Sequence, residues 1–299
     1  MQFTKMQALG NDYVYVNCFE ETIREPERLA RAVSDRHYGI GSDGLILIGP
    51  SDCADCRMEI YNGDGSRGAM CGNGIRCVAK YVYETGIKRK TCLSVETDSG
   101  IRTVYCLVKG ERVENVRVQM GIPSVGREEE LELPGGTVRF VTVQIGNPHA
   151  VLFMEENLHH HHIEETAFTK QKLAGALPGS TETDRYIRET GYRLEHHGRF
   201  PGGTNVEFVW LTENGGLNMR VWERGSGETL ACGTGACAAA AAAMTLGRSR
   251  RQVTVRLPGG TLEVWWPKRN ASMYLTGTAK TVFSGEFQPE DLTFYKEPG

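Results

Sequence analysis

The sequence predicts an α+β protein that contains two copies of one strand-rich unit, each arranged around a single helix. Short apolar or alternating runs, interrupted by glycine, proline and asparagine, predominate and are typical of strands and turns. Helical periodicity is confined to a few segments, including residues 74–85 and 235–246. Each of these two segments follows a Cys-Gly-x-Gly sequence, and this duplication is the basis for predicting two copies.

Length and composition limit the possible classes of protein. A chain of 299 residues has the length of about two domains and can bury a core without disulfides or metals. Hydrophobic residues at 40% exclude wholesale disorder, and a net charge of −3 argues against a nucleic-acid partner. No apolar run is long enough to span a membrane and the start lacks a signal-peptide pattern, so we expect a cytoplasmic protein with no membrane partner. Nine cysteines, an odd number, indicate free thiols.

Individual elements follow from local patterns. We expect strands at apolar runs of strand length, namely residues 13–16, 45–48, 58–61, 138–143, 150–153, 206–210, 219–222 and 261–265. Residues 26–34 predict a helix, because Leu29, Ala32 and Val33 recur at helical spacing. Residues 235–246 are rich in alanine, so they predict a slim helix that other elements can surround closely.

The internal repeat can be followed outward from Cys71 and Cys232, which precede the two helices. Fifteen residues further on, Gly86 and Gly247 are expected to terminate these helices. The other matched pairs are Asn62 with Glu223, Met58 with Met219, Gly44 with Asn205, and Gly10-Asn11 with Gly146-Asn147. The segment between Asn147 and Asn205 in the second half is 25 residues longer than the equivalent segment between Asn11 and Gly44 in the first half. We therefore expect an insertion within about residues 155–195.

The paired Cys-Gly-x-Gly turns indicate a chemical site. A helix N-terminus presents unpaired backbone N–H groups and about half a positive charge, which favours an anion and biases a thiol toward thiolate. Glycines after the cysteine allow backbone amides to approach a ligand closely. Two such turns in equivalent halves suggest two thiols that face each other across one cleft, with a substrate carboxylate between the helix N-termini.

Opposed acid and base groups suit the inversion of a carbon centre. One thiolate removes the proton from Cα, and the opposite thiol returns a proton to the other face. The charge that develops on the carboxylate is held by the helix N-termini, so no cofactor is formally required. Cys71 and Cys232 are therefore candidate catalytic residues. The alternative is that both are small turn residues in a packed, duplicated fold.

Several segments closely resemble the diaminopimelate epimerase family. They are LGND (9–12), GIGSDG (39–44), YNGDGS (61–66), MCGNGIRC (70–77), GNPH (146–149), GTNV (203–206), WERG (222–225) and CGTG (232–235). Apart from the insertion, the resemblance runs from residue 1 to about residue 287. It implies an isomerase that acts without pyridoxal phosphate and converts LL-2,6-diaminopimelate to the meso form, on the way to lysine and peptidoglycan.

The resemblance also implies a fold and a domain division. The fold consists of two pseudo-symmetric domains, each a strand-rich, barrel-like wrap around a central helix. The N-terminal half would comprise residues 1–121 with 277–299, because the final strand returns to the first domain. The C-terminal half would comprise residues 122–276.

The same resemblance implies catalytic roles. Cys71 and Cys232 would be the two acid/base thiols, with His149 and Glu223 tuning them respectively. Glu223 would also hold the substrate α-ammonium group, and Arg224 would offer a bidentate fork to the distal carboxylate.

The remaining implied substrate contacts come from backbone amides and from asparagine side chains. The backbone positions are Gly72, Asn73, Gly233 and Thr234, and the side chains are Asn11, Asn62, Asn147 and Asn205. Each asparagine has an alternative interpretation as a turn residue. Gly44 stands where many family members have glutamine, so it can offer only its backbone. Phe283-Ser284-Gly285 stands where relatives often have a Tyr-x-Gly sequence associated with dimer contacts, and a homodimer is expected.

Other motifs have simpler interpretations. The glycines at 39, 41 and 44 match the dinucleotide-binding pattern, but a strand rather than a helix is expected to follow. Cys53 and Cys56 have no partner Cys-x-x-Cys, and the run His159–His162 is expected to be solvated, so no metal site is predicted. Cys77 and Cys237 are expected in the core.

Two alternative functions remain open from the sequence. One is another two-cysteine racemase of the same fold, acting for example on histidine or proline. Proline-type racemases usually show His after Cys-Gly, where this chain has Asn73, which counts against that substrate. The other is a non-catalytic protein that binds a metal or a ligand.

Overall fold

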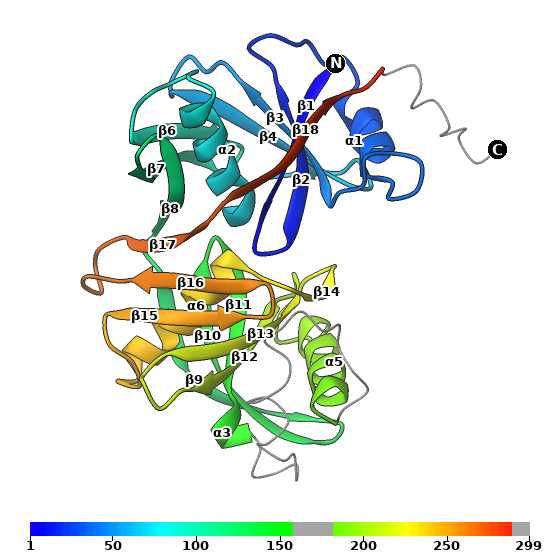
Figure 1. Ribbon diagram of the computed structural model, residues 1–299. Coiled ribbons are helices and arrows are strands. Elements are labelled where there is room, and N and C mark those ends of the chain that lie inside the picture. The colour runs from blue at the N-terminus through cyan, green and yellow to red at the C-terminus, as the bar shows by residue number, and fades with distance from the viewer. Residues whose placement is uncertain (158–181, 289–299) are drawn as a thin grey trace, which may run out of the picture. The chain divides into compact units, whose positions relative to one another are not determined.

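The computed structural model describes residues 1–157 and 182–288, and the chain divides into two compact units. Unit 1 comprises Met1–Gln119 with Thr276–Gly299, and unit 2 comprises Met120–Leu275. In each unit, strands surround one long buried helix, α2 in unit 1 and α6 in unit 2 (Figure 1). The α+β class predicted from the sequence is therefore confirmed.

Unit 1 is organised around six strands that pair in succession. They are β1 (Gln2–Ala8), β2 (Asn11–Asn17), β3 (Gly44–Gly49), β4 (Cys56–Asn62), β6 (Cys92–Thr97) and β7 (Gly100–Lys109). Successive pairs are antiparallel, parallel, antiparallel, parallel and antiparallel. β18 (Lys280–Glu286) pairs with β1, β5 (Arg67–Gly68) pairs with β4, and β8 (Arg112–Gly121) pairs with β7.

Unit 2 repeats this arrangement. Its strands are β10 (Gly136–Ile145), β11 (Asn147–Phe153), β12 (Asn205–Leu211), β13 (Leu217–Glu223), β15 (Gln252–Leu257) and β16 (Gly260–Trp265), with β9 (Ser124–Leu133) and β14 (Gly227–Thr229). The chain passes from unit 2 to unit 1 within β17 (Met273–Thr278). The alternation of parallel and antiparallel pairs is the same as in unit 1. The register also matches, since Tyr13 pairs with Gly44 as His149 pairs with Asn205. The internal repeat predicted from residue spacing is therefore confirmed in the strand pairing.

The central helices are α2 (Gly72–Glu84) and α6 (Gly233–Thr245). Both begin two residues earlier than their apolar periodicity predicts, so each starts immediately after its cysteine. The eight residues Ala236–Ala243 are all fully buried, as expected for a helix that is apolar on every side. Gly86 and Gly247 adopt φ values of 85° and 73° just beyond the helix ends, which confirms the predicted termini.

Helices α1 (Pro26–Ser34) and α5 (Glu182–Glu195) pack on the other face of each set of strands. Side chains alternate along a strand, so Leu45 and Leu47 pack with α1, whereas Ile46 contacts α2. The expected insertion region contains α3 (Met154–Asn157) and α5, while His159–His162 lie outside the described residues. No helix within residues 1–157 and 182–288 is long and apolar enough to cross a membrane.

Candidate active site

Cys71 is the N-cap of α2 in unit 1. Its backbone is extended, with φ −130° and ψ 115°, and the Gly74 N–H donates a hydrogen bond to its Sγ at 3.2 Å. The half-buried thiol in turn donates to Oδ1 of Asn11 at 3.4 Å. A side chain at position 74 would meet the end of Ile46 at 2.7 Å, so glycine allows the helix to begin close against β3. Cys71 is therefore in direct contact with Asn11, one of the asparagines predicted for the site.

Asn11 is held in one orientation by a charged network. Its Nδ2 donates to Oδ2 of Asp43 at 2.8 Å, and the backbone N–H of Asp12 donates to the same oxygen at 3.1 Å. Arg36 bridges the two carboxylates at 3.0 Å each. Burial raises the pKa of the Asp43 carboxyl, and the adjacent Asp12 adds to this effect. This network fixes the Asn11 amide so that its oxygen faces the thiol of Cys71.

Cys232 is the N-cap of α6 in unit 2, with nearly the same backbone conformation, φ −125° and ψ 117°. The Gly235 N–H donates to its Sγ at 3.4 Å, and the Thr234 hydroxyl lies 3.4 Å from the sulfur. Burial raises the pKa of the Cys232 thiol well above its ordinary value, and the negative charges of Glu223 and Glu207 add to this effect. The expectation that the helix start would bias this thiol toward thiolate is therefore wrong, because burial outweighs the hydrogen bonds that stabilise the anion.

The first turns of both central helices contain the predicted backbone donors. Gly72 and Asn73 follow Cys71, and Gly233 and Thr234 follow Cys232. Backbone N–H groups in a first turn have no carbonyl partner within their own helix, so helix geometry turns them toward a ligand. The Asn73 side chain is buried, and its Oδ1 accepts a hydrogen bond from Arg76 at 2.8 Å.

Glu223 and Arg224 lie where β13 ends and turns toward β14. One carboxylate oxygen of Glu223 accepts a hydrogen bond from the Thr229 hydroxyl at 2.5 Å. The backbone N–H of Arg224 donates to Oδ1 of Asn205 at 2.8 Å, and its guanidinium donates to the Gly202 carbonyl at 2.9 Å. Asn205, which is almost fully buried, therefore shapes the turn that presents Arg224.

A carboxylate that the sequence analysis missed holds this turn from α5. The two oxygens of Glu195 accept hydrogen bonds from the Trp222 indole and the Gly225 backbone N–H, each at 2.7 Å. Gly191, one turn earlier, lies so close to Trp222 that a Cβ there would meet its ring at 2.6 Å. Nothing in the motif around Glu223 points to α5, since the partners are almost 30 residues apart in the chain.

The other two predicted asparagines lie at strand ends next to turns, since Asn62 ends β4 and Asn147 begins β11. Asn62 donates to the Ser66 hydroxyl at 2.9 Å, which closes the hairpin between β4 and β5. Asn147 is exposed and follows Gly146 in the turn between β10 and β11. That turn lies beside the start of α6, because a Cβ on Gly146 would be 3.8 Å from the Thr234 methyl group.

His149, the remaining predicted site residue, is fully buried on β11. Its Nδ1 lies 2.7 Å from Oε1 of Glu207, which is also fully buried, on β12. The sequence analysis did not single out Glu207. A signal was present, since it is a carboxylate within the otherwise apolar run from Val206 to Trp210.

Comparison with known proteins identifies the family of this chain. Residues 3–125 and 141–282 match the family model described as diaminopimelate epimerase. The chain belongs to the diaminopimelate epimerase family. A diaminopimelate epimerase of Acetivibrio thermocellus is 43% identical over 98% of this chain and 100% of its own length. That of Moorella thermoacetica is 45% identical, over 96% and 99% respectively. Diaminopimelate epimerases are isomerases of lysine biosynthesis.

Solved structures extend the likeness of fold beyond the diaminopimelate epimerases. A probable proline racemase from Agrobacterium radiobacter superposes with a TM-score of 0.70 at 17% identity, over 97% of this chain and 95% of that one. A methylitaconate-delta-isomerase superposes with a TM-score of 0.67 at 14% identity, over 100% and 99%. At these identities the likeness shows the fold alone.

The structure gives a steric reason for glycine at position 44. A Cβ at this position would lie 2.2 Å from the Tyr61 carbonyl oxygen and 2.8 Å from the Tyr13 ring. The backbone of this chain therefore has no room for a side chain here. The strand that follows, β3, also excludes the dinucleotide interpretation of the three glycines, which requires a helix.

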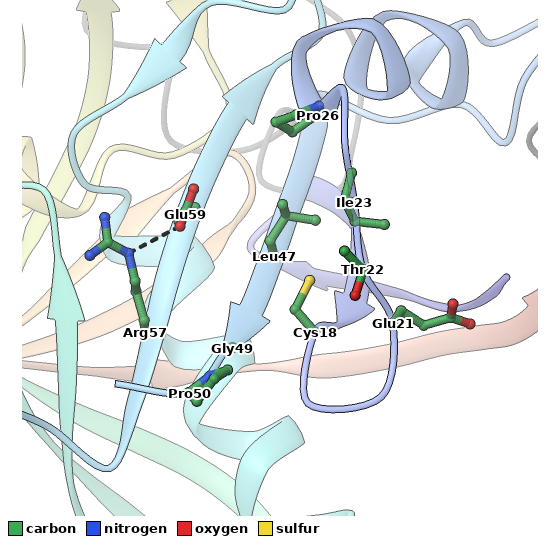
Figure 2. A pocket seen from close by; sticks show the side chains of 10 residues that line it. All are labelled: Cys18, Glu21, Thr22, Ile23, Pro26, Leu47, Gly49, Pro50, Arg57 and Glu59. Carbon is green, nitrogen blue, oxygen red and sulfur yellow. Dashed lines mark hydrogen bonds and ion pairs between the residues drawn. The ribbon is translucent and has the colours of Figure 1, made fainter. Parts of the chain in front are cut away.

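A pocket of about 290 Å³ in unit 1 lies away from the thiol of Cys71. Figure 2 shows its lining, with Cys18 and Leu47 beside the ion pair of Arg57 and Glu59. Leu47 points to the α1 face of the strands, whereas the neighbouring Ile46 contacts α2. Burial, with Glu59 nearby, raises the pKa of Cys18 to about 11, so this thiol remains protonated near neutral pH. The pocket therefore lies apart from Cys71, on the α1 face of the strands.

Proposed function

We propose that this chain interconverts LL-2,6-diaminopimelate and meso-2,6-diaminopimelate by proton transfer at Cα between the thiols of Cys71 and Cys232. One observation carries the proposal. In each unit a cysteine caps the central helix, with the same extended backbone and the same glycine N–H on its sulfur. Membership of the diaminopimelate epimerase family supplies the amino-acid substrate.

The chemistry follows from having one thiolate and one thiol. The thiolate removes the Cα proton from one face of the carbon, and the opposite thiol donates its proton to the other face. Burial raises the pKa of Cys232, which keeps a proton available on its sulfur. In the reverse reaction the two cysteines exchange roles. The first-turn N–H groups of α2 and α6 hold the carboxylate, on which negative charge develops in the transition state.

The remaining site residues divide between tuning and recognition. In this proposal His149 tunes Cys71, and Glu223 tunes Cys232 and holds the α-ammonium group. Arg224 binds the distal carboxylate in a bidentate manner. The other recognition groups are Asn11, Asn62, Asn147 and Asn205, the backbone amides of Gly72, Asn73, Gly233 and Thr234, and the backbone of Gly44. No cofactor takes part, and the N-terminal and C-terminal epimerase halves comprise residues 1–121 with 277–299 and residues 122–276.

Replacement of either cysteine tests the two-thiol scheme. Cys71→Ala and Cys232→Ala should each lower kcat for inversion by at least about 1,000-fold, because each removes one obligatory acid/base group. Thermal unfolding should remain cooperative in both variants. Cys53→Ala and Cys92→Ala, which replace exposed free thiols, are matched controls and should retain activity.

Substantial inversion by either Cys71→Ala or Cys232→Ala would overturn the scheme. Exchange at Cα of histidine or proline, with none for diaminopimelate, would leave the two-thiol chemistry standing but would replace the substrate. Stoichiometric metal in an inactive purified protein would instead support a binding role.

A homodimer and a cytoplasmic location complete the proposal. Val282 and Phe283 are exposed on β18, at the segment that the family resemblance associates with dimer contacts. A reducing compartment fits a pair of thiols that must not be oxidised to a disulfide. Sedimentation of the purified chain tests the dimer, and a monomer at micromolar concentration would contradict it. Fractionation of cells tests the location.

A further inference from the structure

Unit 2 contains a buried ionisable pair in a position where unit 1 has none. Nδ1 of His149 lies 2.7 Å from Oε1 of Glu207, and both side chains are 0% exposed. Among the described residues, neither Nε2 of His149 nor Oε2 of Glu207 has a hydrogen-bond partner. Buried polar atoms are normally satisfied, so two such atoms in one pair suggest a function other than packing.

The equivalent positions in unit 1 show which residues the fold accepts where unit 2 has this pair. The pairing register aligns His149 with Tyr13 and Glu207 with Ile46. In unit 1, the end of Ile46 would lie 2.7 Å from a Cβ at the third helix position, Gly74. Oε1 of Glu207 would lie 2.7 Å from a Cβ at the equivalent Gly235. An isoleucine therefore meets the packing requirement of this position, and the fold does not need a carboxylate there.

A carboxylate in this place is unfavourable unless its partner compensates it. Burial raises the pKa of the Glu207 carboxyl, with Glu223 adding to the effect, while His149 opposes it. Replacing such a group by an apolar residue of similar volume is often neutral or stabilising. Stability therefore does not explain why unit 2 has a carboxylate where unit 1 has an isoleucine.

We propose that Glu207 is a positioning residue for epimerisation, which accepts the Nδ1–H of His149 and thereby leaves Nε2 of that ring free to accept a proton. This inference rests on the proposed function, in which His149 tunes the thiol of Cys71. A proton that leaves the Cys71 thiol goes to Nε2, which produces a thiolate and an imidazolium. The Glu207 carboxylate then compensates the positive charge. After abstraction Cys71 holds the Cα proton and Cys232 has given up its own, so the site resets when Nε2 releases its proton to solvent and Cys232 takes one from solvent.

The roles proposed for Glu207 and His149 agree with the general behaviour of histidine–carboxylate pairs. A carboxylate on one ring nitrogen of histidine fixes the tautomer and the ring orientation, and it stabilises the imidazolium that forms. Without the acceptor, the ring could carry its proton on Nε2, which would then be unable to receive another. Glu207 acts entirely through His149 and does not touch the reacting carbon.

Two substitutions and one spectroscopic signature test the inference. Glu207→Ile, which copies unit 1, should fold and should lower kcat about 10- to 100-fold with little change in KM. Glu207→Gln retains an acceptor oxygen but loses the charge, so kcat should fall by about 10-fold. The matched control is Glu263→Gln on β16, whose carboxylate accepts a hydrogen bond from the Thr254 hydroxyl at 2.6 Å, and this variant should retain wild-type kcat.

The tautomer is read directly from the ¹⁵N signals of the His149 ring, assigned by comparison with a His149→Gln variant. We expect Nδ1 to be protonated and Nε2 unprotonated in the wild type, and this pattern to be lost in Glu207→Ile. A wild-type ring protonated on Nε2, or wild-type kcat in both Glu207 variants, would overturn the inference. If Glu207→Ile fails to fold, the amide variant and the wild-type spectrum decide.

The ring signals also separate this inference from the proposed function. They are measured on the substrate-free protein, so they do not depend on turnover. An inactive wild type with Nδ1 protonated would refute the proposed function alone. An active wild type with Nε2 protonated would refute the inference alone.

Discussion

Gly44 shows how one missing side chain sets the distance between two strands. A Cβ there would lie 2.2 Å from the Tyr61 carbonyl oxygen, which belongs to the backbone of the adjacent strand β4 and cannot rotate away. We expect Gly44→Ala to lower the free energy of unfolding by about 1–3 kcal/mol, the usual range for overpacking a well-packed site. Urea denaturation measures the change.

Gly49, at the end of the same strand, provides the control. Its added Cβ would lie 3.5 Å from the nearest atom, the Cβ of Cys18, which is an ordinary contact. Gly49→Ala should therefore change the free energy of unfolding by less than about 1 kcal/mol. Equal stability of the two alanine variants would contradict the steric account of Gly44.

Single residues also mark the limit of prediction from the sequence. The positions of Cys71 and Cys232 at the two helix starts follow from local spacing, and the structure places them there. The burial of Cys232 does not follow, because it depends on strands distant in sequence, and burial reverses the expected shift of its pKa. Glu207 becomes conspicuous only when the two halves are aligned, since its counterpart is Ile46.

At the scale of elements, α5 fixes the turn that presents Glu223 and Arg224. Glu195 accepts hydrogen bonds from the Trp222 indole and the Gly225 N–H, on either side of that pair. We expect Glu195→Gln to raise KM for diaminopimelate by roughly 10-fold and to lower the free energy of unfolding by about 1–3 kcal/mol, because one donor loses its acceptor. Steady-state kinetics and urea denaturation give the two values.

The matched control for α5 is Glu189→Gln. Glu189 lies on the same helix and makes a solvent-exposed ion pair with Arg193 at 3.3 Å. An exposed pair of this kind contributes little, so both KM and stability should remain close to wild type. An unchanged KM in Glu195→Gln would show that the turn holds its conformation without α5.

Elements also differ in how well the sequence predicts them. Periodicity located α1, α2 and α6, but it did not predict α5. It also placed the starts of α2 and α6 two residues late, because Gly72-Asn73 and Gly233-Thr234 are weak helix formers. The contacts of α5 with β13 could not be anticipated. They join residues that are far apart in sequence, and α5 itself lies in the expected insertion region, which the internal repeat does not predict.

At the scale of the whole molecule, duplication and divergence have separate consequences. Duplication provides two buried helices that each start with a cysteine, on the same pattern of strand pairing. Divergence then places ionisable groups in unit 2 where unit 1 has neutral ones. Glu223 corresponds to Asn62, Glu207 to Ile46, and His149 to Tyr13. In the proposed function, the two copies supply the symmetry that inversion needs, and unit 2 supplies the ionisable groups His149, Glu207 and Glu223.

The measurement that tests the central claim most directly is deuterium incorporation during epimerisation of LL-2,6-diaminopimelate in D₂O, without added pyridoxal phosphate. Two thiols acting from opposite faces should place solvent deuterium at the inverted Cα of the first meso product, while the remaining substrate is still unlabelled. Mass spectrometry of product and substrate at low conversion gives both values. A product that retains its original Cα hydrogen, or an absence of exchange at Cα, would contradict the two-thiol account.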